Sequence, residues 1–239
     1  MNRDKQILLI LIAMIIAIIC IYKIKIEKEK YDCTKVKVYC INLQRRPDRK
    51  DSFLSKIKDS IYYSMLDIEI VDAVDRDNID KDVFEGVLNT TGEIGCYLSH
   101  INCFLRLLST PKTTNFCMIY EDDALCKDTL KEILDTEPTK KYDLLILGSN
   151  YRKGDNITCV DDDEIKQKIC TNLEYVFGAH AYLINKKAAN ILLKNSIPIR
   201  KPFDLYYSNS KEFKDLKIGF LNTSVCSPVN LLDSDSVKN

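Results

Sequence analysis

The sequence of 239 residues has no tryptophan, only two histidines and no excess of either charge sign. Its 35 Lys and Arg side chains are matched by 35 Asp and Glu side chains, so the net charge does not predict a polyanionic partner, and we expect no nucleic acid. Neither His100 nor His180 is grouped with cysteines at zinc spacing, which argues against a structural zinc site. Repeats and low-complexity segments are also lacking. The 46% hydrophobic and 29% charged content is that of a globular protein.

Cysteine is frequent, with ten residues and no CxxC pair. Buried free thiols are the first interpretation for those in apolar strand-like runs or on one helix face: Cys40, Cys117, Cys226, Cys96 and Cys103. If the domain lies in an oxidising compartment, up to five disulfides of unknown connectivity are the alternative. In that case three sequons would also be available for glycosylation: Asn89, Asn156 and Asn222.

A long apolar run lies near the start of the sequence. Ile7–Tyr22 contains 16 uncharged residues, which is about 24 Å of helix. If Lys23 and Lys25 reach back to the interface, the run extends to Ile26 and about 30 Å, the thickness of a bilayer core. Because no small-x-small cleavage site follows, we expect an uncleaved membrane anchor, with a buried globular helix as the alternative.

The chain is accordingly predicted to be a membrane protein with a single span. We expect four segments: a short N-terminal tail (1–6), a transmembrane anchor (7–26), a charged stem (27–35) and one globular domain (36–239). The positive charges that follow the span place this domain in the cytosol by the positive-inside rule. That rule opposes a luminal domain, so the sequence leaves the orientation open.

Strand-like and helix-like segments alternate from residue 36 onward. Strands are expected at 36–43, 68–74, 116–120, 144–147, 181–184 and 218–221. Helices are expected at 47–65, 93–108, 129–134 and 186–193. This alternation predicts an α/β fold with a mostly parallel central sheet, in which ligands bind at the carboxyl ends of the strands.

Three consecutive carboxylates, Glu121, Asp122 and Asp123, directly follow an apolar strand. Adjacent negative charges repel one another unless a cation neutralises them. Oxygen ligands suit Mg²⁺ or Mn²⁺, which also bind diphosphate oxygens. The alternative is a solvated turn, which is how we interpret the second triplet, Asp161–Asp163, because no apolar strand precedes it.

Polar side chains also follow the first predicted strand. Asn42, Arg45, Arg46 and Arg49 occupy the loop and the first helical turn, where guanidinium groups and free backbone N–H groups favour a nucleotide phosphate. The alternative is that these residues form an ordinary exposed start of a helix, with no role in binding.

Three further residues are candidates for chemistry. His100 lies on the flank of an apolar helix face and is more often a packing residue there than a catalyst. His180 precedes a strand and is either a metal ligand or structural. Asp204 follows a proline and is flanked by aromatic residues, which raise a carboxyl pKa and suit a general base; a helix N-cap is the alternative.

Five segments in this order resemble glycosyltransferase family 25, the lipooligosaccharide and procollagen galactosyltransferase-like family. They are VYCINLQRRPDR (38–49), GEIGCYLSHINCF (92–104), MIYEDDA (118–124), FGAHAYLINKKAANILL (177–193) and PFDLYY (202–207). The resemblance implies a GT-A-type fold. It also implies transfer of a hexose, commonly galactose, from a UDP-sugar to a hydroxyl of a glycan, a lipid-linked glycan or a hydroxylysine-type protein acceptor, with inversion.

The resemblance also implies roles for the candidate residues. Glu121, Asp122 and Asp123 match the acidic metal motif, with Asp123 the first choice as ligand to Mn²⁺ or Mg²⁺. The donor nucleotide would lie beside Asn42, Arg45 and Arg49. Asp204 would be the base, and Ser99 and His100 would shape the floor of the site. His180 or water would replace a C-terminal histidine ligand that the chain lacks. Tyrosines would replace the missing tryptophan in stacking on an acceptor sugar: Tyr97, Tyr206 and Tyr207.

Two other classes of protein fit parts of the sequence. A catalytically silent, membrane-tethered protein that binds a sugar nucleotide or carbohydrate is the main alternative, and the intact EDD and Pro-x-Asp segments argue against it. A metal-dependent nuclease is disfavoured by the neutral charge. A Golgi-type transferase in a eukaryotic or viral setting would have its domain in the ER or Golgi lumen.

Overall fold

The computed structural model describes residues 35–80, 88, 90–149, 151–154, 156–209 and 211–229. Three predicted segments lie outside the described residues: the tail, the anchor at 7–26 and the stem up to residue 34. Residues 81–87 and 89 lie outside them as well. Within the described part of the chain, no helix combines the length and the apolar character needed to cross a bilayer.

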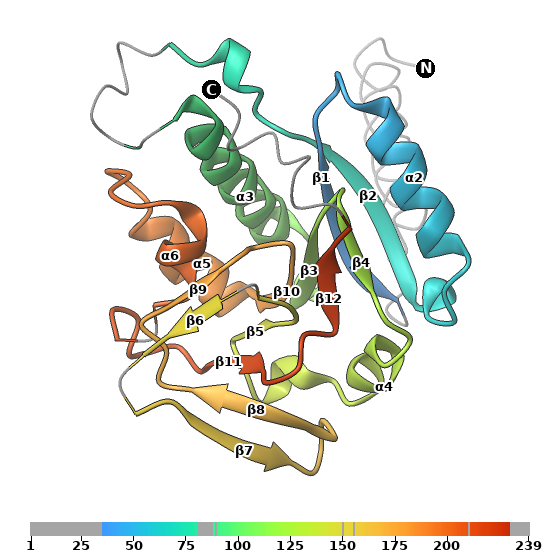
Figure 1. Cartoon of the computed structure of the whole chain (residues 1–239), viewed down its shortest axis with the longest axis vertical. Helices are drawn as coiled ribbons and strands as arrows, with labels where there is room; N and C mark the ends of the chain where they lie inside the picture. Colours follow the sequence, from blue (N-terminus) through green and yellow to red (C-terminus); the bar gives the residue numbers. More distant parts are fainter. Residues whose placement is uncertain are drawn as a thin grey trace, which may run out of the picture. The chain divides into compact units, whose positions relative to one another are not determined.

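A sheet of eight strands runs through the described domain, in the order β2-β1-β3-β10-β5-β11-β8-β7 (Figure 1). Its strands are β1 (Val36–Asn42), β2 (Leu66–Asp72), β3 (Phe116–Glu121), β5 (Leu144–Ile146), β7 (Thr158–Asp162), β8 (Gln167–Thr171), β10 (Ala181–Asn185) and β11 (Ile218–Leu221). β10 is antiparallel to both of its neighbours, as is β8. The other six strands share one direction, since their remaining pairings are parallel. The fold is therefore mixed α/β, and the expected mostly parallel sheet is confirmed for strand direction but not for pairing.

Two small sheets flank the large one. β4 (Ala124–Cys126) pairs with β12 (Cys226–Pro228), and β6 (Tyr151–Lys153) pairs with β9 (Tyr175–Phe177), both antiparallel. β4 follows the acidic segment almost directly, so its pairing with β12 fixes the chain just beyond the end of β3.

Helices cover both faces of the large sheet, which makes three layers. They are α2 (Pro47–Lys58), α3 (Thr91–Ser109), α4 (Leu130–Asp135), α5 (Lys186–Lys194) and α6 (Phe203–Tyr207). All seven residues of β1 are buried, as expected for a strand covered on both sides. Tyr39 and Ile41 pack in one apolar cluster with α3, α5 and α6. Val38 and Cys40 point the opposite way, into a second cluster with α2 and α4, because side chains alternate along a strand.

The long helix α3 has a strong start signal in the sequence. The Thr90 hydroxyl accepts a hydrogen bond from the Glu93 N–H, and the Glu93 carboxylate accepts one from the Thr90 N–H. This capping box satisfies two N–H groups that the first turn would leave without partners. It fixes where the helix begins, and therefore which of its side chains face the end of β3.

α2 ends earlier than its apolar spacing predicts. Phe53 and Ile57 are buried, but Ile61 is 59% exposed. The chain turns after residue 58, where both the N–H and the hydroxyl of Ser60 donate to the Ile57 carbonyl. Tyr62 then points into the core and donates to the Cys126 carbonyl at 3.0 Å. The predicted helix up to residue 65 is therefore wrong: α2 ends at Lys58, and the turn that follows lets the Tyr62 side chain enter the core.

The stretch 149–167 has no clear strand or helix pattern in the sequence, but the structure places a strand in it: β7, which pairs with β8 in a hairpin. Asp162 ends β7 and is buried. Its carboxylate accepts hydrogen bonds from the Tyr142 hydroxyl and from the N–H groups of Glu164 and Ile165, and it pairs with Lys141 at 2.8 Å. The second acidic triplet is therefore not a plain loop, because its middle carboxylate holds the hairpin turn together.

Four of the described cysteines form disulfides, Cys126–Cys226 and Cys159–Cys170. Each pair joins directly opposed residues of an antiparallel strand pair. The free-thiol prediction is wrong for Cys226, because β12 places it opposite Cys126, a register the sequence does not show. It is confirmed for the remaining described cysteines: Cys40, Cys96, Cys103 and Cys117.

The two disulfides close loops of very different length, with sequence separations of 100 and 11. On the chain-entropy account, replacing Cys126 and Cys226 by Ser is expected to lower the free energy of unfolding by about 4–5 kcal/mol, and replacing Cys159 and Cys170 by about 3 kcal/mol. Denaturant unfolding without reductant measures both losses, and non-reducing peptide mapping checks the connectivity. Recovery of Cys226 as a free thiol would contradict the pairing.

Candidate functional site

The candidate site begins where β1 and β3 end at the same edge of the sheet. The two strands are parallel neighbours, with Ile41 opposite Glu121. The Asp122 N–H donates to the Ile41 carbonyl at 3.1 Å, which continues the pairing past the strand end. The Asn42 amide then donates to the Asp122 carboxylate at 2.6 Å. The sheet register therefore brings together residues that are 80 positions apart in the chain.

Arg49 joins this strand edge to the first turn of α2. Its guanidinium forms ion pairs with the carboxylates of Asp122 and Asp123, the latter at 2.8 Å. The Arg49 side chain is 12% exposed, so these charges interact in a medium of low polarity, where pairing matters most. Both carboxylate oxygens of Asp122 are now engaged, one by Asn42 and one by Arg49. Asp122 is therefore held in position by protein partners at both oxygens, and its role as a metal ligand stays a prediction, with Asp123 the first choice.

Asp123 is the least compensated carboxylate of the three. Its Oδ1 is buried and accepts no hydrogen bond from any residue that the structure describes. Burial and the charge of Glu121 raise the pKa of the Asp123 carboxyl to about 7, although the Arg49 guanidinium opposes the shift. A buried oxygen with excess negative charge around it is what a divalent cation would neutralise. Asp123 thus fits the expected oxygen ligand.

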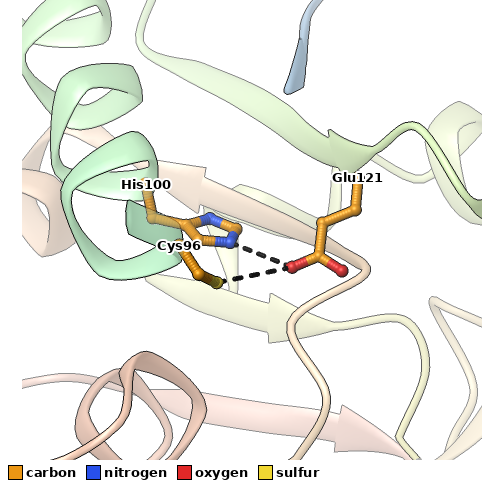
Figure 2. Close-up of side chains that lie close together, drawn as sticks. All are labelled: Cys96, His100 and Glu121. Carbon is orange, nitrogen blue, oxygen red and sulfur yellow. Dashed lines mark hydrogen bonds and ion pairs between the residues drawn. The ribbon is translucent and has the colours of Figure 1, made fainter. Parts of the chain in front are cut away.

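Glu121 turns toward α3 instead. Its Oε1 lies 3.2 Å from His100 Nε2 and 3.9 Å from Cys96 Sγ, as Figure 2 shows. Burial alone would raise the pKa of Glu121, but the hydrogen bond and charge of His100, together with the charges of His180 and Arg49, hold this pKa below its usual value. Burial, with the nearby charge of Glu121, raises the pKa of the Cys96 thiol well above its usual value.

The ring of His100 is fixed on both sides. Its Nδ1 lies 2.9 Å from the Tyr182 hydroxyl, and its face stacks on Phe203 at 4.1 Å between ring centroids. Ser99, the neighbouring residue, accepts a hydrogen bond from the Val74 N–H at 2.8 Å and so ties α3 to the chain after β2. Both residues line the pocket described next, and their role in shaping the floor of a donor site stays a prediction.

A pocket opens beside these groups. It holds about 620 Å³ of space, including the open solvent at its mouth. Its polar lining combines three guanidinium groups with the acidic segment: Arg45, Arg49, Arg76, Glu121, Asp122 and Asp123. Arg45 is held by Asp75 at 2.7 Å. Arg76 was not expected here, because it lies in an irregular stretch whose sequence gives no signal of where it folds back.

His180 and Asp204 do not line this pocket. The charge of Glu121 nevertheless affects the pKa of both residues. The His180 carbonyl accepts from the Glu121 N–H at 2.9 Å. Burial lowers the pKa of His180, although the carboxylates of Glu121 and Asp204 oppose the shift. Its Nε2 is buried and has no hydrogen-bond partner among the described residues. Gly178 makes room for the ring, because its φ is +100° and a Cβ there would lie 2.2 Å from His180 Cε1.

Asp204 accepts two backbone hydrogen bonds, from Gly178 N–H at 3.1 Å and Leu205 N–H at 2.8 Å. Pro202, not Asp204, holds the N-cap position of α6, so the N-cap alternative is wrong. Burial raises the pKa of the Asp204 carboxyl, although the two N–H donors oppose it. The carboxylate is therefore both oriented and partly shielded from water.

The three tyrosines expected to stack on an acceptor sugar are core residues. Tyr97, Tyr206 and Tyr207 are all buried, and their hydroxyls donate to the backbone carbonyls of Ser196, Leu192 and Gly178. Their spacing around α3 and α6 reflects packing, with Tyr97 and Tyr206 at 5.4 Å between ring centroids. Because their rings are buried in the core, these tyrosines do not offer an exposed face for stacking on a sugar.

Comparison with known families decides the class. The family "Glycosyltransferase family 25 (LPS biosynthesis protein)" matches residues 35–207. The chain belongs to glycosyltransferase family 25. The match covers both strand ends, α3 and α6, and therefore every residue of the candidate site.

Curated relatives include proteins named as galactosyltransferases and proteins named as inactive. Procollagen galactosyltransferase 1-A of Xenopus laevis is 28% identical over 188 residues, which is 69% of this chain and 29% of the relative. Inactive glycosyltransferase 25 family member 3 of Homo sapiens is 26% identical over 145 residues, which is 52% of this chain and 23% of the relative. The chain thus spans less than a third of the length of these relatives. Among solved structures, A197 from STIV matches with a TM-score of 0.42 and 12% identity, over 80% of this chain and 83% of that one.

The raised pKa of Asp123 predicts a pH-dependent stability. In the folded chain the pKa is about 7, against an ordinary value of 3.8. Between these values the folded chain binds more protons than the unfolded chain, so the free energy of unfolding falls as the pH rises. We expect a loss on the order of 1 kcal/mol or more between about pH 5 and pH 8 without divalent cations. Denaturant unfolding at both pH values measures it.

The matched variants are Asp123→Asn, which should abolish this part of the pH dependence, and Asp163→Asn, which changes an exposed carboxyl of the second triplet and should leave it intact. Identical pH profiles for wild type and Asp123→Asn would contradict the assigned environment of Asp123.

Proposed function

We propose that this chain transfers a hexose, with galactose the first candidate, from a UDP-sugar to a hydroxyl of a glycan, a lipid-linked glycan or a hydroxylysine-type protein acceptor, with inversion and on a GT-A-type fold. One observation carries the proposal: a buried Asp123 oxygen, with no hydrogen-bond partner among the described residues, belongs to a residue that lines a pocket together with three arginines. Carboxylate and guanidinium groups together suit a metal-bound diphosphate. The names of the galactosyltransferase relatives support the choice of sugar.

In this proposal Asp123 would hold a Mn²⁺ or Mg²⁺ ion. Such an ion supplies stabilisation of the negative charge that develops on a leaving UDP. The side chains of the protein bind the donor and position the acidic segment. Arg45, Arg49 and Arg76 bind and orient the donor, while Asn42 and Arg49 keep the acidic segment in position by holding Asp122.

Asp204 is the proposed general base, which removes the proton of the acceptor hydroxyl. The hydrogen bonds from Gly178 and Leu205 aim its carboxylate, and the raised pKa makes it a stronger base than an exposed aspartate. The carboxylate of Asp204 also acts on the buried His180, whose Nε2 has no hydrogen-bond partner among the described residues.

Slow hydrolysis of a UDP-sugar without acceptor tests the metal and donor roles. We expect one donor among UDP-galactose, UDP-glucose and UDP-GlcNAc to be hydrolysed only with Mn²⁺ or Mg²⁺. Asp123→Asn should lower this rate by about 10²-fold or more, because removing one group that stabilises transition-state charge costs about that much. Asp163→Asn is the matched control and should keep the full rate.

A catalytically silent binder of sugar nucleotides is the second candidate, favoured by the similarity to a relative named inactive. It predicts Mn²⁺-dependent UDP binding with no hydrolysis and no transfer to any acceptor. Absence of UDP binding, with or without metal, would contradict both candidates.

Replacing the base gives a separate prediction. Asp204→Asn is expected to lower kcat for transfer by about 10²–10⁴-fold while leaving UDP affinity unchanged. Because only the deprotonated carboxylate can accept a proton, kcat of the wild type should fall as the pH drops, through a pKa above the ordinary 3.8. Asp215→Asn, at an exposed aspartate, is the control. An unchanged kcat in Asp204→Asn would rule out the base.

We also propose that the domain lies in an oxidising compartment, the ER or Golgi lumen in a eukaryotic or viral setting, tethered by a membrane anchor at residues 7–26. The two disulfides support this placement, and the exposed Asn156 and Asn222 are then open to glycosylation. Trapping the thiols of the chain as isolated from its own cell tests the placement. Reduced cysteines at both pairs would overturn it.

A further inference from the structure

The side chains of Cys96, His100 and Glu121 form a cluster that the proposed transfer reaction does not use as a unit (Figure 2). Cys96 and His100 lie one turn apart on α3, so both project from the same helix face. Glu121 reaches them from the end of β3. One sulfur, one ring nitrogen and one carboxylate oxygen all lie within 4.8 Å of one another.

We propose that these three residues form a binding site for a zinc-class divalent cation, separate from the oxygen-ligand ion at Asp123. Thiolate and imidazole ligands favour Zn²⁺ over Mg²⁺ and Mn²⁺. A site with three protein ligands and one open position is the arrangement found in catalytic zinc centres. The proposal stands whether or not the transfer reaction is confirmed.

The distances agree with tetrahedral coordination. Zinc bonds of about 2.3 Å to sulfur and about 2.0–2.2 Å to nitrogen and oxygen place neighbouring ligands roughly 3.3–3.6 Å apart. His100 Nε2 lies 3.2 Å and Cys96 Sγ lies 3.9 Å from Glu121 Oε1. The third separation, between the sulfur and the ring nitrogen, is within 4.8 Å, so a change in the Cys96 side-chain torsion would bring the sulfur to bonding distance without moving α3 or β3.

The contacts of His100 hold its ring in the orientation that a metal ligand needs. Without a metal, a proton on Nε2 is shared with Glu121 Oε1 at 3.2 Å. When Nδ1–H instead donates to the Tyr182 hydroxyl at 2.9 Å, the Nε2 lone pair is directed at Glu121, and a cation can take the place of that proton. Such an outer hydrogen bond is the usual way in which proteins orient a metal-binding histidine, and stacking on Phe203 prevents the ring from turning.

The fourth position of this site faces the pocket, because all three residues belong to the pocket lining. A bound ion would therefore accept water, or an oxygen of a molecule in the pocket, as its fourth ligand. On binding, the Cys96 thiol loses its proton to solvent and the thiolate bonds to the ion.

Cobalt titration of the full chain, freed of metal and kept under argon, tests the site. We expect one equivalent of Co²⁺ to produce a thiolate-to-cobalt charge-transfer band together with the intense visible bands of tetrahedral cobalt. One equivalent of Zn²⁺ should abolish both, whereas excess Mg²⁺ should not. Absence of the charge-transfer band in the wild type would overturn the proposal.

Variants identify the ligands and separate the two metal sites. Cys96→Ala should lose the charge-transfer band, and its Zn²⁺ affinity should fall by more than the roughly 10–100-fold that loss of an outer partner costs. Cys103→Ala, which changes another free thiol of α3, should keep the band, as should Asp123→Asn. Retention of the band in folded Cys96→Ala would overturn the proposal. Cys96→Ser serves the same purpose if Cys96→Ala does not fold.

Discussion

The candidate site depends on the double ion pair of Arg49 with Asp122 and Asp123. It joins the first turn of α2 to the ends of β1 and β3, and with Asn42 it engages both oxygens of one carboxylate. A single guanidinium cannot neutralise three adjacent carboxylates. Asp123 is the carboxylate whose negative charge is compensated least, and its Oδ1 has no hydrogen-bond partner among the described residues. A stable scaffold and an incompletely compensated oxygen thus arise from the same contact.

The three consecutive acidic residues have different roles because the side chain of each one faces a different part of the fold. Asp122 turns toward β1 and α2, where it is held by Asn42 and Arg49. Glu121 turns toward α3, where His100 and Cys96 meet its Oε1. Asp123 stays at the pocket. Consecutive residues that leave a strand point in different directions, so a motif of three acids need not be one set of ligands.

Much of this arrangement could be predicted from the sequence, because the site lies where strong local patterns end. The β-branched run of β1, the apolar run of β3 and the helical spacing of α3 indicated where Asn42, Glu121 and His100 lie. Other features depend on contacts between distant segments, which no local pattern records. Tyr62 stops α2 by entering the core, Cys226 meets Cys126 only through β12, and Arg76 reaches the pocket from an irregular stretch. The sequence did not indicate a zinc site at Cys96 and His100, because their third partner, Glu121, meets them only when α3 lies beside the end of β3.

The most direct test of this account is a crystal of the chain grown with Mn²⁺ and UDP, with the anomalous scattering of manganese recorded. The account predicts one manganese peak in contact with Asp123 Oδ1 and with UDP phosphate oxygens, and UDP lying beside Arg45, Arg49 and Arg76. Asp122 should remain bound to Asn42 and Arg49. A manganese ion held by Asp122, or UDP bound outside this pocket, would contradict the assignment of the site.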